Sequence, residues 1–147
     1  MSQLMFKLPE IDRELTKEAV EAALEKYRFY LLSVPDEKLP KVTSTFSLVP
    51  PSFTNGFHSS TEEAAISNVD YEMEKERHLQ NIIRGVNRLS KMEREIIYKR
   101  YLEVEETFDY EIYNEMGFSE RRFYRLKARI FYKLAFILKI EVYKNES

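Results

Sequence analysis

The sequence predicts an all-α fold, a helical bundle that ends in a helix-turn-helix and is preceded by one further helix. Apolar residues recur at spacings of three and four along most of the chain, which is the period of one helix face. Only 3 of the 147 residues are glycine, and four of the five prolines lie in one segment, so turns are few and clustered. The predicted domains are an N-terminal helix (1–33), a Pro/Ser/Thr-rich linker (34–60) and a helix-turn-helix domain (61–147).

The composition excludes several classes of protein. With 44% hydrophobic and 33% charged residues, the chain has enough apolar surface for a core and is not wholly disordered. The absence of cysteine excludes disulfides, thiol catalysis and cysteine-ligated zinc. The first residues do not resemble a signal peptide, and apolar runs such as Phe29–Leu32 are far shorter than the roughly 20 residues of a membrane span. We therefore expect a cytoplasmic protein without a membrane partner.

The first predicted helix runs from Thr16 to Ser33. Thr16 is its expected N-cap, and Pro35 prevents its continuation. Spacings of four, three and four place its apolar residues on one buried face: Val20, Leu24, Tyr27 and Leu31.

The predicted linker contains four prolines and many hydroxyl residues. Val42–Val49 is rich enough in β-branched residues for a short strand, but no partner strand is evident. We expect an extended linker or lid, ordered by aromatic side chains that dock on a helix: Phe46, Phe53 and Phe57.

Two more helices are predicted after the linker. The first begins at Ser60, where Ser60-Thr61-Glu62-Glu63 fits a capping box, and Gly85 allows a break or bend in it. Its apolar stripe continues toward Ser90 through Ile66, Val69, Met73, Leu79, Ile82, Val86 and Leu89. The second runs from about Lys91 to Leu102, with one apolar side formed by Met92, Ile96, Ile97 and Tyr101.

A helix-turn-helix is predicted from Asp109 onward. The first helix covers about Asp109–Met116 with Asp109 as N-cap, and Gly117 suits the left-handed backbone that ends a helix. Ser119 is the expected N-cap of a second helix that extends to about Lys139. That helix should bury an apolar face made by Phe123, Leu126, Ile130, Leu134 and Ile137.

The last helix is strongly basic in a chain of net charge −2. Gly117–Lys139 holds seven basic residues and a single acidic one. This charge favours a polyanion, and a recognition helix inserts its first turns into the major groove, so we expect duplex DNA as partner. The alternative is a helical bundle with a merely basic surface. The expected DNA contacts are base edges for Arg121, Arg122 and Arg125, and phosphates for Ser119, Tyr124, Lys127 and Arg129.

The segment Leu89–Leu134 resembles region 4 of sigma-70-type factors. Leu89–Tyr101 is similar to that family's helix before the motif, and Ser119–Arg129 is similar to its recognition helix. Tyr113 departs from the pattern, because most helix-turn-helix proteins have a small residue at that position. The close packing of the two helices is therefore expected to differ.

The chain as a whole more closely resembles the ArpU-like regulators of phage and prophage late genes. The similarity lies in its length, its acidic N-terminal part and three segments: Phe57–Ile66, Asp109–Tyr113 and Ser119–Tyr124. The resemblance implies control of late transcription, including packaging and lysis genes, in a phage or prophage of a Gram-positive bacterium. Composition and spacing by themselves predict only DNA binding.

Signals for catalysis are weak. His58 has no partners at a spacing typical of a triad. Glu74 and His78 lie four residues apart, but a metal site needs a third and a fourth ligand. No glycine-rich phosphate motif is present. We expect no catalytic site, no metal and no cofactor, and therefore not an enzyme.

The expected mechanism is promoter binding that recruits or retains RNA polymerase. Operators are usually read by paired motifs, so a homodimer is expected through an apolar seam of Phe131, Phe136, Ile137, Leu138 and Ile140. Three alternatives stay open at this point: a sigma-like specificity subunit of RNA polymerase, a DNA-packaging adaptor of the small-terminase type, and a protein-interaction bundle without DNA affinity.

Overall fold

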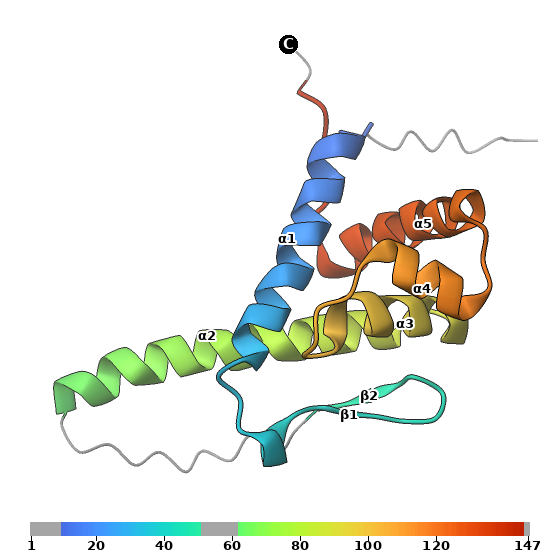
Figure 1. Cartoon of the computed structure of the whole chain (residues 1–147). Coiled ribbons are helices and arrows are strands. Elements are labelled where there is room, and N and C mark those ends of the chain that lie inside the picture. The colour runs from blue at the N-terminus through green and yellow to red at the C-terminus, as the bar shows by residue number, and fades with distance from the viewer. Residues whose placement is uncertain (1–9, 51–61, 146–147) are drawn as a thin grey trace, which may run out of the picture.

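The fold is mostly helical in the part of the chain that the structure describes, residues 10–50 and 62–145 of a computed structural model (Figure 1). This confirms the predicted helical class. The structure also contains a small β-hairpin that was not predicted. The elements in chain order are α1 (Arg13–Leu31), the 3-10 turn η1 (Asp36–Lys38), β1 (Lys41–Val42), β2 (Leu48–Val49), α2 (Glu62–Asn87), α3 (Lys91–Ile97), the π-helical turn η2 (Tyr98–Leu102), α4 (Asp109–Met116) and α5 (Glu120–Leu138).

Helix α1 begins earlier than predicted. Asp12 is its N-cap, since the carboxylate accepts a hydrogen bond from the backbone N–H of Leu15 at 3.0 Å. The predicted cap, Thr16, is buried inside the first turns, and its hydroxyl exchanges hydrogen bonds with the backbone of Val142. The prediction of Thr16 as the N-cap was wrong, because its hydroxyl is hydrogen-bonded to a segment distant in sequence, the chain after α5. That segment also pairs with Ile11.

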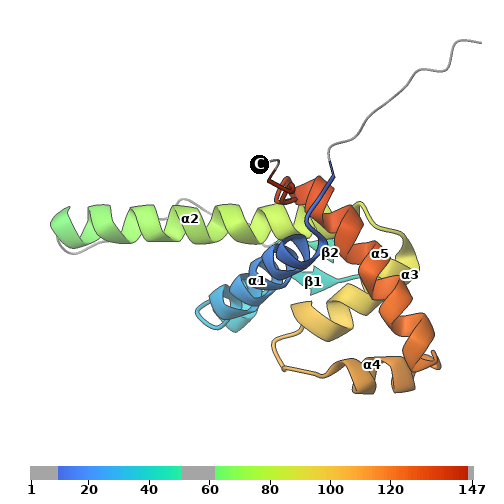
Figure 2. The ribbon, with the colours of Figure 1, turned by 90° about the horizontal axis from the view of Figure 1, so that it is seen from above.

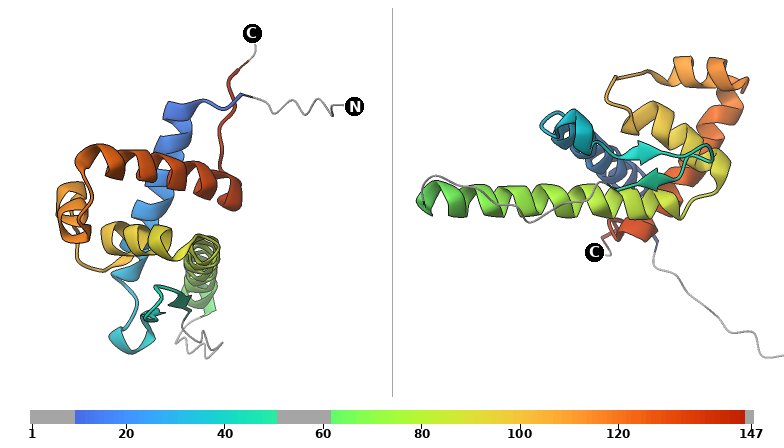
Figure 3. Two further views of the ribbon diagram at one scale, coloured as in Figure 1. Left: turned by 90° about the vertical axis from the view of Figure 1, so that its right-hand side faces the viewer. Right: turned by 90° about the horizontal axis from the view of Figure 1, so that it is seen from below.

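The hydrophobic core draws on all of the longer helices. Helix α1 runs across α5 and α2, and α4 lies at the N-terminal end of α5 (Figure 3). The predicted face of α1 is buried here, together with residues of α2, α3, η2 and α5. Helix α1 therefore shares one core with segment 61–147. Among the described residues, no helix has the length and apolar character needed to cross a membrane.

Helix α2 is continuous through Gly85, a position where the sequence allows a break or bend. A Cβ at this position would lie 2.8 Å from Cδ2 of Leu138, so the glycine allows the end of α5 to approach closely. The N-terminal half of α2 extends beyond the other helices (Figure 2). The capping box predicted at Ser60–Glu63 lies outside the residues whose side chains are described.

Met73 does not belong to the buried stripe of α2, contrary to the prediction. Its side chain is 52% exposed, because it precedes Leu79 by six residues and so falls on another face. Lys75, four residues before Leu79, occupies the inward position. Its ammonium group donates to the Ser33 hydroxyl at 3.2 Å and pairs with Glu72 at 2.9 Å.

The segment predicted as one helix from Lys91 to Leu102 changes type along its length. Ser90 caps α3 in a capping box with Glu93. The last turn is π-helical, and the backbone N–H of Glu103 donates to the carbonyl of Tyr98 at 3.1 Å. Arg28 of α1 donates to the Arg100 carbonyl at 2.7 Å and so binds a backbone oxygen of this turn.

The described part of the linker contains η1 and a hairpin. The partner strand that was not evident in the sequence is β2, at the end of the stretch Val42–Val49. Lys41 pairs with Val49 and Val42 with Leu48 in antiparallel register. A tight turn makes this possible, since Phe46 adopts a positive φ of 60°. The Phe46 ring packs against Tyr98, as predicted for an aromatic docking residue, whereas Phe53 and Phe57 lie outside the described residues.

Asn87 fastens this hairpin to α2. Its side-chain oxygen accepts from the Leu48 N–H at 2.8 Å, and its amide nitrogen donates to the Leu48 carbonyl at 2.9 Å. The Leu48 side chain is buried, so the same residue supplies apolar contact and two hydrogen bonds.

We predict that Asn87→Ala lowers the free energy of unfolding by about 1–2 kcal/mol, because both backbone groups of Leu48 lose their partner. Hydrogen exchange at residues 43–49 should accelerate in the same variant. Urea unfolding and exchange mass spectrometry measure the two effects. Asn81→Ala is the matched control, since Asn81 is an exposed residue of the same helix whose side chain accepts a hydrogen bond from Arg84. Equal exchange in the hairpin of both variants would contradict the assignment.

Candidate nucleic-acid interface

Helices α4 and α5 are joined by a three-residue turn whose local chemistry agrees with the sequence. Gly117 has a φ of 74°, the left-handed conformation that glycine adopts without strain, and it ends α4. The Phe118 N–H donates back to the Tyr113 carbonyl at 2.9 Å. Ser119 is the N-cap of α5, and its hydroxyl accepts from the Arg122 N–H at 3.2 Å. The predicted bounds of both helices are therefore confirmed to within one residue.

The two helices pack through a pair of aromatic rings. The centroids of Tyr113 and Phe123 lie 5.6 Å apart at a tilt of 54°. Phe123 of α5 and Ile112 of α4 are both buried. The large residue at position 113 is thus accommodated at the edge of the contact.

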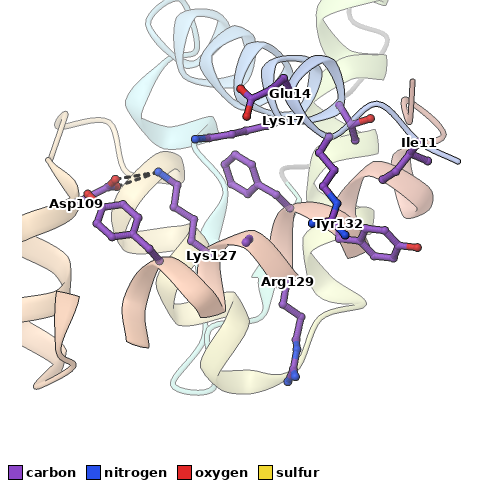
Figure 4. A pocket seen from close by; sticks show the side chains of 12 residues that line it. Ile11, Glu14, Lys17, Asp109, Lys127, Arg129 and Tyr132 are labelled. Carbon is purple, nitrogen blue, oxygen red and sulfur yellow. Dashed lines mark hydrogen bonds and ion pairs between the residues drawn. The ribbon is translucent and has the colours of Figure 1, made fainter. Parts of the chain in front are cut away.

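The sequence predicts Asp109 as the N-cap of α4, and this prediction was wrong. Phe108 holds the N-cap position, and Asp109 is the first helical residue. The Asp109 carboxylate instead forms ion pairs with two cations, Arg100 Nε at 2.6 Å and Lys127 Nζ at 2.9 Å. It thereby joins η2, α4 and α5, and Figure 4 shows the pair with Lys127 (Figure 4).

The protonation of Asp109 follows from these contacts. Burial alone disfavours the carboxylate, but the hydrogen bonds from Lys127 and Arg100 outweigh burial and lower the pKa of Asp109 below its ordinary value. The group is ionised at neutral pH. The ion pair between Asp109 and Lys127 therefore links α4 to α5 in a way that is lost when acid protonates the carboxylate.

Lys127 lies apart from the other predicted DNA-contacting residues. It is only 8% exposed, and its ammonium group lies over the rings of Tyr101 and Phe131 at 5.4 and 5.5 Å. The sequence held a signal for this position. Lys127 follows Phe123 by four residues and precedes Ile130 by three, which is the spacing of the core face. Its predicted contact with a DNA phosphate is incompatible with this burial.

The remaining predicted residues lie together on the outer surface of α5. Arg121, Arg125 and Arg129 follow one another at spacings of four and form one exposed stripe. Arg122 is also exposed, with its guanidinium 4.8 Å from the centre of the Phe118 ring. In the described part of the chain, no carboxylate forms an ion pair with these four arginines, which we call the arginine face.

Tyr124 lies beside the arginine face and is also exposed. Partial burial, followed by the nearby Asp109 carboxylate, raises the pKa of its hydroxyl, so the group is a neutral hydrogen-bond donor at physiological pH. Ser119 is exposed at the start of the helix.

The apolar residues expected to form a dimer seam pack mostly within the chain. Phe131 is buried against Tyr101, with ring centroids 5.8 Å apart. Ile137, Leu138 and Ile140 are half-buried against the core. The predicted homodimer remains a prediction, and this seam is largely occupied intramolecularly.

Glu74 and His78 both contact α1, and among the described residues they belong to no group of three or more possible metal ligands. The Glu74 carboxylate pairs with Lys26 at 3.3 Å. The His78 ring bonds the Ala23 carbonyl at 2.9 Å, and burial lowers the pKa of this histidine. Their spacing therefore reflects helix packing between α1 and α2.

The chain is similar over nearly its full length to a phage-related bacterial protein and to a phage protein. It is 38% identical over 140 residues to the "uncharacterized phage-related protein Lin1259/Lin1739" of Listeria innocua serovar 6a, which covers 95% of this chain and 98% of that protein. It is 31% identical over 145 residues to "Protein Gp66" of Listeria phage A118, covering 97% and 99% of the two chains. No protein-family model and no solved structure matches the chain.

We predict that Asp109→Asn lowers the free energy of unfolding at neutral pH by about 2–3 kcal/mol, because the buried Lys127 ammonium loses its counter-charge. The effect should vanish in acid. Since the folded-state pKa of Asp109 is below the unfolded one, its stabilisation is present above the ordinary carboxyl pKa and is lost as the pH falls through the lowered value. Urea unfolding as a function of pH measures this dependence.

The matched control is Glu106→Gln, which removes one exposed carboxylate of the loop before α4. It should keep the wild-type pH dependence. If Asp109→Asn showed the same loss of stability on acidification as the wild type, the lowered pKa of this carboxyl would be refuted.

Proposed function

The chain belongs to the family of phage-related proteins represented by these two Listeria sequences, and we propose that it is a sequence-specific DNA-binding regulator of phage late-gene transcription. The observation that carries the proposal is the arginine face: four exposed guanidinium groups on a capped helix that form no ion pair within the described residues. The protein acts by binding, without catalysis, metal or cofactor.

The geometry of α4 and α5 supports a helix-turn-helix. In that motif the second helix enters the major groove with its N-terminal residues at base edges, while the first crosses the backbone. The arginine face occupies the first three turns of α5, where such contacts occur. The opposite face holds buried Phe123 and Ile130, so α5 can present one side to DNA without exposing its core.

Arginine suits both contacts that the proposal requires. Its planar guanidinium donates two parallel hydrogen bonds to O6 and N7 of guanine, and it also pairs with phosphate. We assign Arg121, Arg122 and Arg125 to base edges and Arg129 to a phosphate. Tyr124 and the helix N-terminus at Ser119 supply neutral donors to the backbone.

The biological role rests on the phage-related family together with the resemblance to ArpU-like late-gene regulators. A regulator of this kind binds a promoter and recruits or retains RNA polymerase there. Packaging and lysis genes are the proposed targets, because these are the genes that the resembled regulators control.

We predict that Arg121→Ala/Arg122→Ala/Arg125→Ala abolishes the preference for a duplex recovered by binding selection from random DNA. Each base-contacting arginine should be worth roughly tenfold or more in discrimination. Fluorescence anisotropy with the selected and a random duplex measures it. The control variant Lys38→Ala/Lys41→Ala/Arg77→Ala removes three exposed charges elsewhere and should retain the preference. A triple arginine variant that keeps full discrimination would exclude this face as the reading surface.

Arg125→Lys separates base reading from charge. Lysine keeps the positive charge but not the planar fork, so binding to random duplex and its dependence on salt should be unchanged. Affinity for the selected duplex should fall roughly tenfold. Titrations of both duplexes at several salt concentrations provide the measurement. An equal loss on both duplexes would show that Arg125 contacts a phosphate.

A further inference from the structure

A cleft of about 710 Å³ lies between the first turns of α1 and the side of α5 that faces them. Figure 4 shows side chains of both helices around it. Phe131, Ala128 and the Lys127–Asp109 pair are also among its lining groups. The polar side chains at its rim are Arg13, Glu14 and Lys17 of α1 and Tyr124, Arg129 and Tyr132 of α5.

The cleft carries a net positive charge. Lys127 and Asp109 neutralise each other. In the described residues, neither Arg13 nor Lys17 forms an ion pair, and both are exposed. Glu14 is the remaining carboxylate of the lining, so Arg13 and Lys17 of α1 outnumber it.

The cleft adjoins the arginine face. Arg129 lines the cleft and also continues the stripe of Arg121 and Arg125, and in Figure 4 it leaves α5 on the side turned away from α1. Lys17 extends from α1 into the cleft toward its Asp109 end in the same view. Exposed cations therefore lie on both elements, with Arg13 and Lys17 of α1 at the cleft and the arginine face on the side of α5 turned away from α1.

We propose that Arg13 and Lys17 of α1 bind the phosphate backbone of the duplex whose major groove receives the arginine face. This inference rests on the proposed function and adds a second DNA-contacting element to it. Arg13 and Lys17 are four residues apart and so share one face of α1. The exposed hydroxyls of Tyr124 and Tyr132 provide neutral donors to phosphate oxygens between the two cationic edges.

A polymer backbone fits this cleft better than a small anion. The cations at its rim are all exposed, so none is desolvated around an enclosed ligand. Phosphates of a duplex are spaced along a line, and cations that follow a groove replace their condensed counterions. Arg13 and Lys17 of α1 and the arginine face of α5 offer exposed cations at two separate places along such a line.

The test is Arg13→Ala/Lys17→Ala, compared with the wild type and with Lys38→Ala/Lys41→Ala as a control of equal charge. The probes are the selected duplex and a random duplex of the same length, titrated over a range of salt concentrations. We expect the α1 variant to lose affinity for both duplexes by the same factor. The slope of log affinity against log salt should become shallower by about 0.9 for each lost phosphate contact.

The outcomes separate this inference from the proposed function. If the wild type discriminates between the duplexes and the α1 variant keeps the wild-type salt slope, α1 does not contact the backbone and the inference fails alone. If the wild type binds neither duplex in a salt-dependent way, the proposed function fails as well. A changed ratio between selected and random duplex would overturn the assignment to phosphate. Far-UV circular dichroism and thermal unfolding verify that the exposed substitutions leave the fold intact.

Discussion

The orientation of α5 depends on one partly buried carboxylate. Asp109 accepts hydrogen bonds from Lys127 of α5 and Arg100 of η2, so a single residue of α4 connects three elements. Aromatic rings surround this junction, and the Tyr101 hydroxyl donates onward to Glu21 of α1 at 3.0 Å. Removing one member of such a network leaves a largely buried charge without its partner, so the geometry is strongly specified.

The far end of α5 is held by a different kind of contact. Gly85 of α2 leaves room for Leu138, and a side chain at that position would displace it. Beyond the left-handed Lys139, the chain returns along the start of α1, where Thr16 and Val142 exchange hydrogen bonds. Polar contacts thus fix the first half of α5 and close packing fixes the second. A helix held at both ends presents its outer face in a fixed direction.

The DNA contacts proposed for the outer face of α5 and the first turns of α1 depend on that rigidity. DNA recognition requires guanidinium groups placed accurately against base edges, and a loosely held helix would lose discrimination before it lost affinity. The charges that are needed internally are paired: Lys127 and Arg100 with Asp109, and Lys133 with Glu93. The arginines of the outer face lack such partners in the described residues. The molecule thereby separates cations that hold the fold from cations available to a ligand.

The sequence by itself determined the helical class, the buried face of α1, the turn at Gly117, the cap at Ser119 and the division of α5 into two faces. These features depend on residues three or four apart, or on one residue's own backbone preference, so local spacing contains them. The tertiary structure decided the roles of Thr16, Asp109, Gly85 and Lys75. Each is set by a partner distant in sequence, such as Val142 for Thr16 or Leu138 for Gly85, and periodicity does not identify such partners. Lys127 combines both cases. Its spacing placed it on the core face, but only the fold brought the Asp109 carboxylate next to its ammonium group.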